Sequence, residues 1–372
     1  MPHRILVSWT AIALAVILLC APVFMAQAPS QGKPIDKTAF DTEAAIKAAG
    51  DATKAETAAT AKWTPPRTAW GDPDVQGYWL TATYTPLQRP TELAGKAFYT
   101  EEEAIAAFKK AVEADAGVDP RTVHYDWKEY AMDAWQSPVR PNLRTSLIVD
   151  PENGRIPPLT AEAQKRQADA RAAAAKGRNP QVGVQTLGNL YTRCVTGNNA
   201  GPMTRGGQPG SDSAAAAAGV TAEAQLLQTP GYAVLIVQSN GDPRIIPLDG
   251  RPHLPPTVRN YLGDSRGHFE GNTLVVETTN FIVPGTNFLG GTNNTKLTER
   301  FTRVGPNTLR YEFTLDDPAT WTRPWTAETL LPRVDPPLYE FACHEQNYGL
   351  MNVVKGAQVR EAEEAAKKAL TK

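Results

Sequence analysis

The second half of the chain is a succession of short apolar runs, and this pattern constrains the fold more than any other feature. About seven runs rich in Val, Ile, Thr, Phe and Tyr are separated by Gly, Pro, Asn and Asp, and they cover residues 232–239, 244–250, 272–281, 296–304, 307–317, 326–333 and 338–345. Such runs between turn residues are typical of antiparallel strands. We therefore predict a mainly β protein, with an antiparallel, barrel-like and lipocalin-like sheet over residues 221–356.

One pair of these runs defines its own register. Pairing Phe301 with Tyr311 across the turn at residues 304–307 places Arg300 opposite Glu312. A slip by one residue would instead set two arginines against each other, which is unfavourable. The preferred register separates an apolar face from a charged face. The apolar face consists of Leu297, Phe301, Leu309, Tyr311 and Phe313. The charged face consists of Arg300, Arg310 and Glu312.

The first half of the chain is predicted to be irregular and partly helical. Residues 63–220 combine aromatic residues with prolines and glycines, and we expect helices over residues 99–114 and 160–177. Thr100 can cap the first helix, and Glu103 occupies its capping-box position. We expect the aromatic residues to pack this segment on the sheet, with stacking on a ligand as the alternative.

The remaining segments contain few large apolar residues. Residues 29–62 are interpreted as a flexible polar tether or a loose helix, and we expect their removal to leave stability nearly unchanged. Residues 357–372 are predicted to form a C-terminal helix or tail.

Residues 1–28 have the order of a secretory signal peptide, with charged residues, an apolar run and then small residues. The apolar run, Ala11 to Val23, is shorter than the roughly 20 residues that a bilayer requires, so we expect no transmembrane segment. The sequence therefore predicts export to the periplasm or beyond. In an oxidising compartment, Cys194 and Cys343 are expected to form a disulfide, with two separate buried thiols as the alternative.

The charges of the chain nearly cancel. Lys and Arg number 38 and Asp and Glu number 39, which gives a formal net charge of -1. This balance does not favour nucleic acid or an anionic membrane as a partner. We expect a small-molecule ligand or substrate, and the oligomeric state stays open.

Three long stretches carry a resemblance to a known family. They are "RTSLIVDPENGRIPPLTAEAQKR", "RIIPLDGRPHLPPTVRNYLGDSRGHFEGNTLVVETTNF" and "LTERFTRVGPNTLRYEFTLDDPATWTRPWT". In these stretches the chain resembles a large family of secreted bacterial proteins of uncharacterised function, over most of residues 63–356. The resemblance implies an exported bacterial protein and brings no particular reaction with it.

The stretch from Gly263 to Phe281 is the main candidate for a functional site. Its first residues concentrate titratable side chains between glycines, and we predict that they form a tight loop before a strand at residues 274–279. Loops on a rigid scaffold commonly carry chemistry. Asp264 and Arg266 are favoured as functional residues over Glu270, which is expected to begin a hairpin; turn capping and ion pairing are the structural alternatives.

Histidines supply the candidates for proton transfer, because their pKa lies near neutral pH. His253 lies on a proline-rich segment just before the stretch, and His344 follows Cys343, so a disulfide would hold it near residue 194. We predict His253, Asp264, Arg266 and His344 as catalytic residues. The predicted ligand contacts are Arg251, Tyr261, His268, Glu345, Tyr348 and Trp127.

Several common metal and cofactor motifs are not found in the sequence. It contains no HExxH pair, no phosphate-binding P-loop and no GxGxxG. We therefore expect neither a metal nor a cofactor. The leading hypothesis is an exported enzyme that uses acid/base chemistry on a sugar-like or hydrophobic substrate, as a lyase, isomerase or hydrolase. The alternatives are a periplasmic small-ligand-binding protein without turnover and a structural protein associated with the envelope.

Overall fold

The structure is a computed structural model in which part of the chain can be described. The described residues are 42–60, 63–116, 139–175, 193–194, 201–203, 223–238, 243–282, 291–334, 338, 342, 344–345 and 347–370. The chain divides into two units, Met1–Asp41 and Thr42–Lys372, and the description below concerns the second unit. The predicted signal peptide lies outside the described residues.

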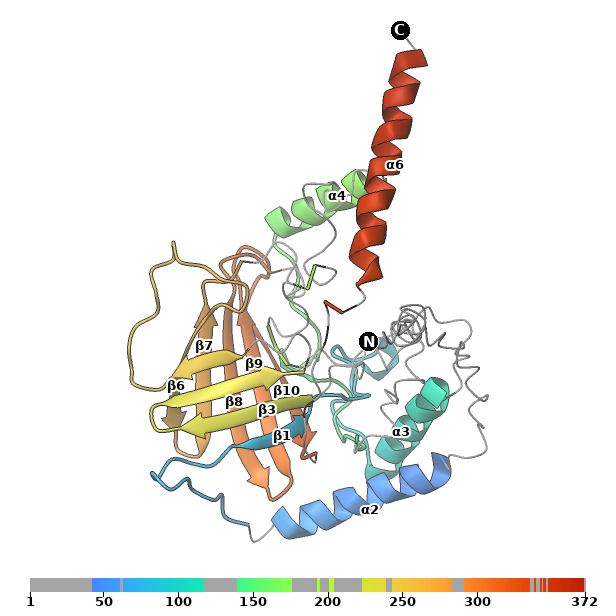
Figure 1. Ribbon diagram of the computed structural model, residues 1–372. Helices are drawn as coiled ribbons and strands as arrows, with labels where there is room; N and C mark the ends of the chain where they lie inside the picture. The colour runs from blue at the N-terminus through green and yellow to red at the C-terminus, as the bar shows by residue number, and fades with distance from the viewer. Residues whose placement is uncertain are drawn as a thin grey trace, which may run out of the picture. The chain divides into compact units, whose positions relative to one another are not determined.

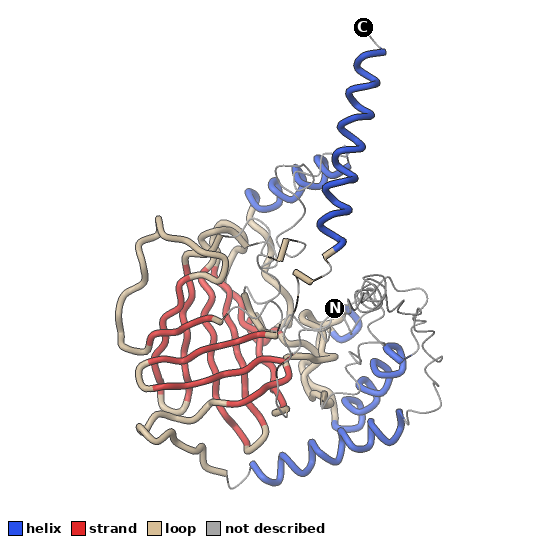
Figure 2. Tube along the Cα trace, viewed as in Figure 1, coloured by secondary structure: helices blue, strands red, loops and turns tan. Residues whose placement is uncertain are grey.

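The strands form two antiparallel sheets, which confirms the prediction of a mainly β protein (Figures 1 and 2). The first sheet has the order β1-β3-β4-β5, with β1 Gly77–Leu80, β3 Glu223–Thr229, β4 Tyr232–Val237 and β5 Arg244–Pro247. The second sheet has the order β2-β10-β9-β8-β7-β6, with β2 Ile148–Asp150, β10 Trp325–Pro332, β9 Thr308–Asp316, β8 Lys296–Gly305, β7 Thr273–Thr279 and β6 Asp264–Glu270.

The edges of the two sheets approach each other between β1 and β10 and between β5 and β6. Trp79 and Arg333 form an isolated bridge next to β1 and β10. In β6, a Cβ atom on Gly267 would lie 2.7 Å from Leu248 and 2.9 Å from Ile246, so the chain after β5 passes close to this strand. Within the residues described, however, no ladder closes the two sheets into one barrel. The predicted strand at residues 338–345 lies mostly outside the described residues.

The predicted register of the β8–β9 hairpin is confirmed. Phe301 pairs with Tyr311 and Arg300 pairs with Glu312. The apolar face is fully buried, whereas Arg300 is partly exposed. The buried face forms part of a core cluster to which both sheets contribute, including Leu226 and Leu235 from the first sheet. Alternation of apolar and polar residues therefore determines which side of these strands faces the core.

The two helices predicted in the first half of the chain are confirmed as α3, Glu101–Ala116, and α4, Ala161–Ala175. The capping box at α3 is present, because the Glu103 amide donates to the Thr100 hydroxyl at 3.2 Å and the Thr100 amide donates to the Glu103 carboxylate at 2.8 Å. A short 3-10 helix, η1, covers Thr91–Leu93.

The polar segment before Trp63 is more ordered than a tether. Residues Thr42–Thr60 form helix α2, which contacts α3 and β8. Its Ala49 packs against a small core cluster of Leu80, Ala82, Phe108 and Val139. The interpretation as a loose helix is thus the closer one, and the contacts with α3 and β8 explain why the helix forms despite its few large apolar residues.

The C-terminal helix is longer than predicted. Helix α6 covers Tyr348–Leu370, whereas the sequence placed its start near residue 357. Ala357 is its one buried residue within the described range. None of the helices in the described part of the chain combines the length and apolar character that a membrane span requires.

Candidate functional site

The predicted corner at residues 263–271 is a strand and not a loop. Asp264–Glu270 form β6, which pairs with β7 along its whole length. The glycines that suggested a loop have other roles. Gly267 lies inside the strand where Ile246 and Leu248 approach closely, and Gly271, with φ of 58°, forms the hairpin turn to β7. The hairpin expected after Glu270 is therefore present, and the loop before it is not.

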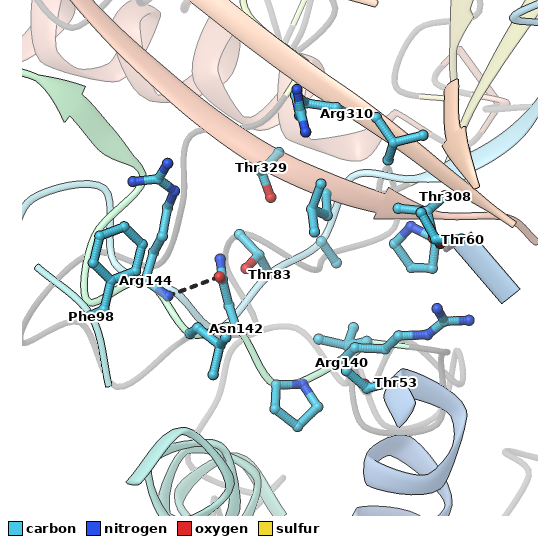
Figure 3. Close-up of a pocket in the computed structure, with 17 residues that line it drawn as sticks. Thr53, Thr60, Thr83, Phe98, Arg140, Asn142, Arg144, Thr308, Arg310 and Thr329 are labelled. Carbon is cyan, nitrogen blue, oxygen red and sulfur yellow. Dashed lines mark hydrogen bonds between the residues drawn. The ribbon is translucent and has the colours of Figure 1, made fainter. Parts of the chain in front are cut away.

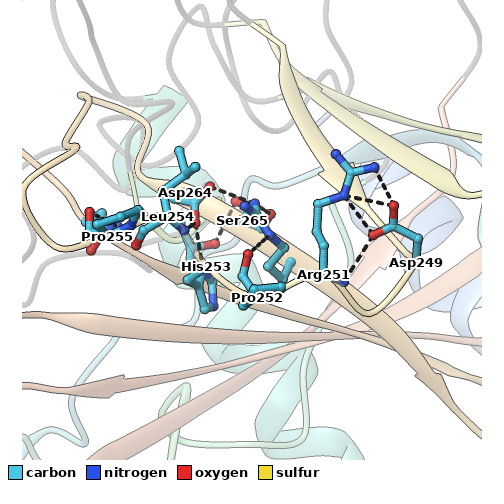
Figure 4. A network of polar contacts seen from close by, with 11 residues as sticks. Asp249, Arg251, Pro252, His253, Leu254, Pro255, Asp264 and Ser265 are labelled. Atoms are coloured by element: carbon cyan, nitrogen blue, oxygen red, sulfur yellow. Dashed lines mark hydrogen bonds and ion pairs between the residues drawn. The ribbon is translucent and has the colours of Figure 1, made fainter.

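Three of the predicted catalytic residues meet at the start of β6 (Figure 4). His253 Nδ1 lies 2.9 Å from Asp264 Oδ2, and Arg266 Nη1 donates to Asp264 Oδ1 at 2.6 Å. The Leu254 amide also donates to Asp264 Oδ2 at 2.9 Å. Asp264 is buried, with 7% of its side chain exposed, whereas His253 retains 27% exposure. One carboxylate thus anchors the proline-rich segment to the edge strand of the sheet.

The charge state of Asp264 determines the tautomer of His253. Burial raises the pKa of Asp264, but the hydrogen bonds from Leu254, His253 and Arg266 outweigh it and hold this pKa below its ordinary value of 3.8. An ionised carboxylate can only accept hydrogen bonds, so Nδ1 of His253 is the donor. Nε2 then carries the lone pair that can accept a proton. In the part of the chain that the structure describes, Nε2 has no hydrogen-bond partner.

Backbone contacts hold the segment before β6 in place. Arg266 Nε donates to the Pro252 carbonyl at 3.0 Å, and Asn280 Nδ2 donates to the Leu254 carbonyl at 2.9 Å. Asn280 adopts φ of 59°, a conformation that asparagine tolerates better than most residues. The position of His253 is therefore determined by contacts from β6 and from the end of β7.

Arg251 contacts Asp249 and Tyr232 and not the residues around Asp264. Its Nε lies 2.8 Å from both carboxylate oxygens of Asp249, and its Nη2 donates to the Tyr232 hydroxyl at 3.2 Å. The hydrogen bonds from Arg251 lower the pKa of Asp249 to about 2. Because this pair is exposed, it contributes little stability. The structure does not bring Arg251 to His253 through a direct contact.

The remaining predicted residues do not join the corner. His268 and Glu270 form an exposed contact of 3.1 Å, and Arg300 donates to Glu270 at 2.6 Å. Tyr261 is half-buried. His344 and Glu345 are exposed, as is Tyr348, and no hydrogen bond between the described residues connects His344 to the corner. His344 is thus not grouped with the other three catalytic candidates.

Two predicted residues, Trp127 and Cys343, lie outside the described residues. The Asn347 side chain donates to Cys194 Sγ at 3.2 Å, so the chain four residues beyond position 343 lies beside Cys194. This proximity is compatible with the disulfide, which stays a prediction.

A pocket of about 540 Å³ lies elsewhere, on the outer side of β9 and β10 (Figure 3). Residues 139–144 and helix α2 form its other walls, the latter through Thr53 and Thr60. Its apolar lining includes Ala82, Phe98, Val139, Leu143, Val304 and Leu330. None of the residues predicted from the sequence lines this pocket.

The charged residues that line the pocket are all arginines. Arg144 lies over the Phe98 ring, 5.0 Å from its centroid, and its Nε donates to Glu328 at 3.2 Å. Arg310 lies 3.9 Å from the same carboxylate. Arg140 has a buried Nε without a hydrogen-bond partner. One carboxylate therefore contacts two of the three guanidinium groups and neutralises one positive charge, so the pocket has an excess of positive charge.

A local signal for this pocket exists in the sequence. Residues 139–144 read "VRPNLR", in which arginines alternate with apolar residues around a proline. A segment of this kind places cations among apolar side chains, which is a common feature of sites for organic anions. Its other walls come from distant parts of the chain, which no local pattern identifies.

The comparisons with protein-family models, with curated proteins and with solved structures give no match for this chain. Among the residues that can be described, no group of three or more His, Cys, Asp or Glu side chains is placed to hold a metal ion. The function must therefore be inferred from the geometry of the corner around Asp264 and of the pocket beside β9 and β10.

Asp264 allows a direct test of whether the corner is held by its carboxylate. Replacing it by asparagine should lower the free energy of unfolding by about 1 to 3 kcal/mol, because a buried acceptor of three hydrogen bonds loses its charge. Since its pKa is depressed in the folded state, its contribution is present above pH 3.8 and is lost as the pH falls through the lower, folded-state pKa. Urea unfolding at several pH values measures both effects.

The matched control is Glu270→Gln, which changes an exposed carboxylate on the same strand. It should change stability by less than about 0.5 kcal/mol. Equal effects of the two substitutions would show that Asp264 does not anchor the corner.

Proposed function

We propose that this protein binds a small organic anion with an apolar body in the pocket beside β9 and β10. The observation that carries the proposal is a cavity of about 540 Å³ whose charged lining residues are all arginines. This volume lies in the range of about 300 to 1,000 Å³ that is typical of small-molecule sites. The apolar walls would cover the body of the ligand, and a guanidinium group would bind its anionic end.

Arg140 is the best candidate for the anion contact. Arg144 and Arg310 share Glu328, whereas no ion pair of Arg140 is found among the described residues. Its Nε is buried, and an unpaired buried donor costs about 1 to 3 kcal/mol. A carboxylate at this position would satisfy the donor and offset the charge.

Octanoate and octanamide provide a matched pair of probes, because they differ in charge and hardly in shape. We expect octanoate to bind at least about tenfold more tightly by calorimetry, which corresponds to about 1.4 kcal/mol. Arg140→Met should remove this preference and retain most of the affinity for octanamide. Arg323→Met is the control, because Arg323 pairs with Asp150 and does not line the pocket. Equal affinities of the unmodified protein for both probes would contradict the proposal.

Helix α2 permits a second test of the pocket. A chain that begins at Trp63 lacks Thr53 and Thr60, and therefore one wall of the site. We expect its affinity for octanoate to fall about tenfold, or about 1.4 kcal/mol. Its melting temperature should fall by only a few degrees, because α2 buries no large side chain among those described. Unchanged affinity would place the ligand away from α2.

A second candidate function is acid/base catalysis at His253. It is favoured by the 2.9 Å contact between His253 Nδ1 and the ionised Asp264, which orients the imidazole. This arrangement suits proton transfer through Nε2 in a lyase, isomerase or hydrolase. Hydrolysis of 4-nitrophenyl acetate is a simple probe. We expect His253→Ala to abolish any rate above background, and His268→Ala, at an exposed histidine, to retain it; equal rates for both variants would exclude the role.

Further elements of the proposal come from the sequence. Export to the periplasm is supported by the signal-like order of residues 1–28 and by the resemblance of the chain to a family of secreted proteins. A barrel-like enclosure is supported by the approach of β5 to β6 and by the bridge between Trp79 and Arg333. Export and a barrel-like enclosure are therefore both part of the proposal of an exported binding protein.

A further inference from the structure

The pocket beside β9 and β10 has an apolar rim that is open to solvent. The rim consists of Phe98, Leu143 and Leu330, which all line the pocket and whose exposed fractions are 54%, 52% and 51%. A single exposed apolar side chain is ordinary on a protein surface, but several around one pocket mark an interaction site. Among the described residues, the other large apolar side chains that are more than half exposed belong to β5 and α6. The rim is therefore a separate apolar surface that belongs to this pocket.

The rim and the proposed anion contact lie on different sides of the pocket (Figure 3). Phe98 and Arg144 lie together on one side of the view, whereas Arg140 lies toward the other side. The Tyr99 amide donates to the Leu143 carbonyl at 2.7 Å, so the two chain segments that carry Phe98 and Leu143 are held next to each other. A ligand whose charge meets Arg140 must therefore extend across the pocket before it reaches the rim.

The charges of the pocket determine the orientation of such a ligand. Arg144 Nε donates to Glu328 at 3.2 Å, so a ligand carboxylate beside Arg144 would meet a negative charge. Arg140, in contrast, has no ion pair among the described residues. The charged end is therefore expected at Arg140, and the apolar end at the rim.

The apolar lining is mainly aliphatic. Phe98 is the single aromatic side chain in the part of the lining that the structure describes, and the guanidinium of Arg144 lies over its ring. Aromatic ligands gain from stacking on aromatic side chains, so this lining favours an alkyl body over a ring system. The volume of about 540 Å³ also exceeds the need of a short chain, since octanoate would occupy roughly 300 Å³ at about 30 Å³ for each group of the size of a water molecule.

We infer that the apolar body of the ligand is a single aliphatic chain of more than eight carbons, which crosses the pocket and covers the rim. The position of its carboxylate at Arg140 rests on the proposed function, and the inference adds the length and the linear form of the body. A chain of this length would remove the rim side chains from water, and the burial of apolar surface would supply most of the affinity.

A series of chain lengths tests the inference by calorimetry. We expect the affinity to rise from octanoate through decanoate to dodecanoate by at least about twofold for each CH₂ group. Complete burial of a CH₂ group would give about fourfold, which corresponds to about 0.8 kcal/mol. A short chain held at Arg140 does not reach the rim, so the increase depends on the longer chains making new contacts there.

Phe98→Ser tests whether the rim provides these contacts. It should lower the affinity for dodecanoate about tenfold, and the affinity for octanoate by less, because the rim loses most of its apolar area. Ile245→Ser is the control, since Ile245 is 60% exposed on β5 and does not line the pocket. Both positions are exposed, so both variants should fold, and Ile245→Ser should bind both probes as the unmodified protein does.

The inference is overturned if octanoate and dodecanoate bind with equal affinity, or if the two serine variants weaken dodecanoate binding equally. If octanoate is then still preferred over octanamide, the proposed anion site is retained without the long chain. Octanamide and decanamide cover the opposite case, because neither carries a charge. If octanoate and octanamide bind equally, but decanamide binds at least about fourfold more tightly than octanamide and loses this advantage in Phe98→Ser, the long aliphatic body is supported and the proposed anion contact is wrong.

Discussion

Replacing Glu299 by leucine should lower the free energy of unfolding by about 3 to 5 kcal/mol. Glu299 is fully buried in β8, and it accepts hydrogen bonds from Arg244 and Tyr311. The substitution leaves the guanidinium of Arg244 as an uncompensated charge in the core and leaves the Tyr311 hydroxyl without its acceptor. Both groups would be unable to reach water without opening the interface between the two sheets. Urea unfolding followed by tryptophan fluorescence measures the loss.

Two controls separate this effect from the loss of an acidic side chain in general. Glu277 of β7 pairs with Lys296 of β8 at 2.5 Å, but this pair is exposed, so Glu277→Leu should change stability by less than about 1 kcal/mol. Arg244→Met/Glu299→Leu should recover most of the stability lost by Glu299→Leu, because no charge then remains unpaired. A double variant as unstable as the single one would mean that the pair itself, and not the unpaired arginine, stabilises the core.

The register of the β8–β9 hairpin was predictable, but Glu299 was overlooked. The same alternation that assigns Leu297 and Phe301 to the core face also assigns Glu299 to it, since the three lie at every second position of β8. Arg244 lies on the core face of β5 together with Ile246. A charged residue at an inward position of a strand is therefore the signal that identifies this pair from the sequence, although its partner is revealed only by the arrangement of the sheets.

The corner around Asp264 could be predicted because its members are close in the sequence. His253, Asp264 and Arg266 lie within fourteen residues, so a single turn of the chain brings them together. The pocket could not be found in this way. Its walls come from α2, from residues 139–144 and from β9 and β10, and only the packing of these distant segments creates the cavity.

The prediction of a loop at residues 263–271 was wrong for a physical reason. Glycine and short polar residues lower the intrinsic preference for a strand, but every residue from Asp264 to Glu270 lies opposite a residue of β7, and pairing with that strand offsets the low preference. Tertiary packing also requires Gly267 to lack a side chain. A glycine in this stretch therefore indicates either a close contact or a turn.

Gly263→Ala should be the most damaging single substitution next to the corner, with a loss of about 2 to 5 kcal/mol. Gly263 has φ of 73°, which is unfavourable for alanine. A Cβ atom there would lie 2.6 Å from Thr278 Cγ2 and 2.7 Å from the Thr279 carbonyl oxygen, and a backbone atom of a paired strand cannot move aside cheaply. Because Asp264 is the next residue, the strain should also displace the carboxylate from His253.

Gly271→Ala isolates the strain from the steric overlap. Gly271 has φ of 58°, but an added Cβ atom would have no neighbour within 4 Å, so we expect a loss of only about 1 kcal/mol. Thermal unfolding of the two variants measures the difference, and the ¹⁵N resonances of the His253 ring report on its hydrogen bond to Asp264. We expect the Nδ1 resonance to change in Gly263→Ala and to stay in place in Gly271→Ala. If the two variants lose the same stability, then β7 yields to the added methyl group, and the backbone around Asp264 is less constrained than its contacts indicate.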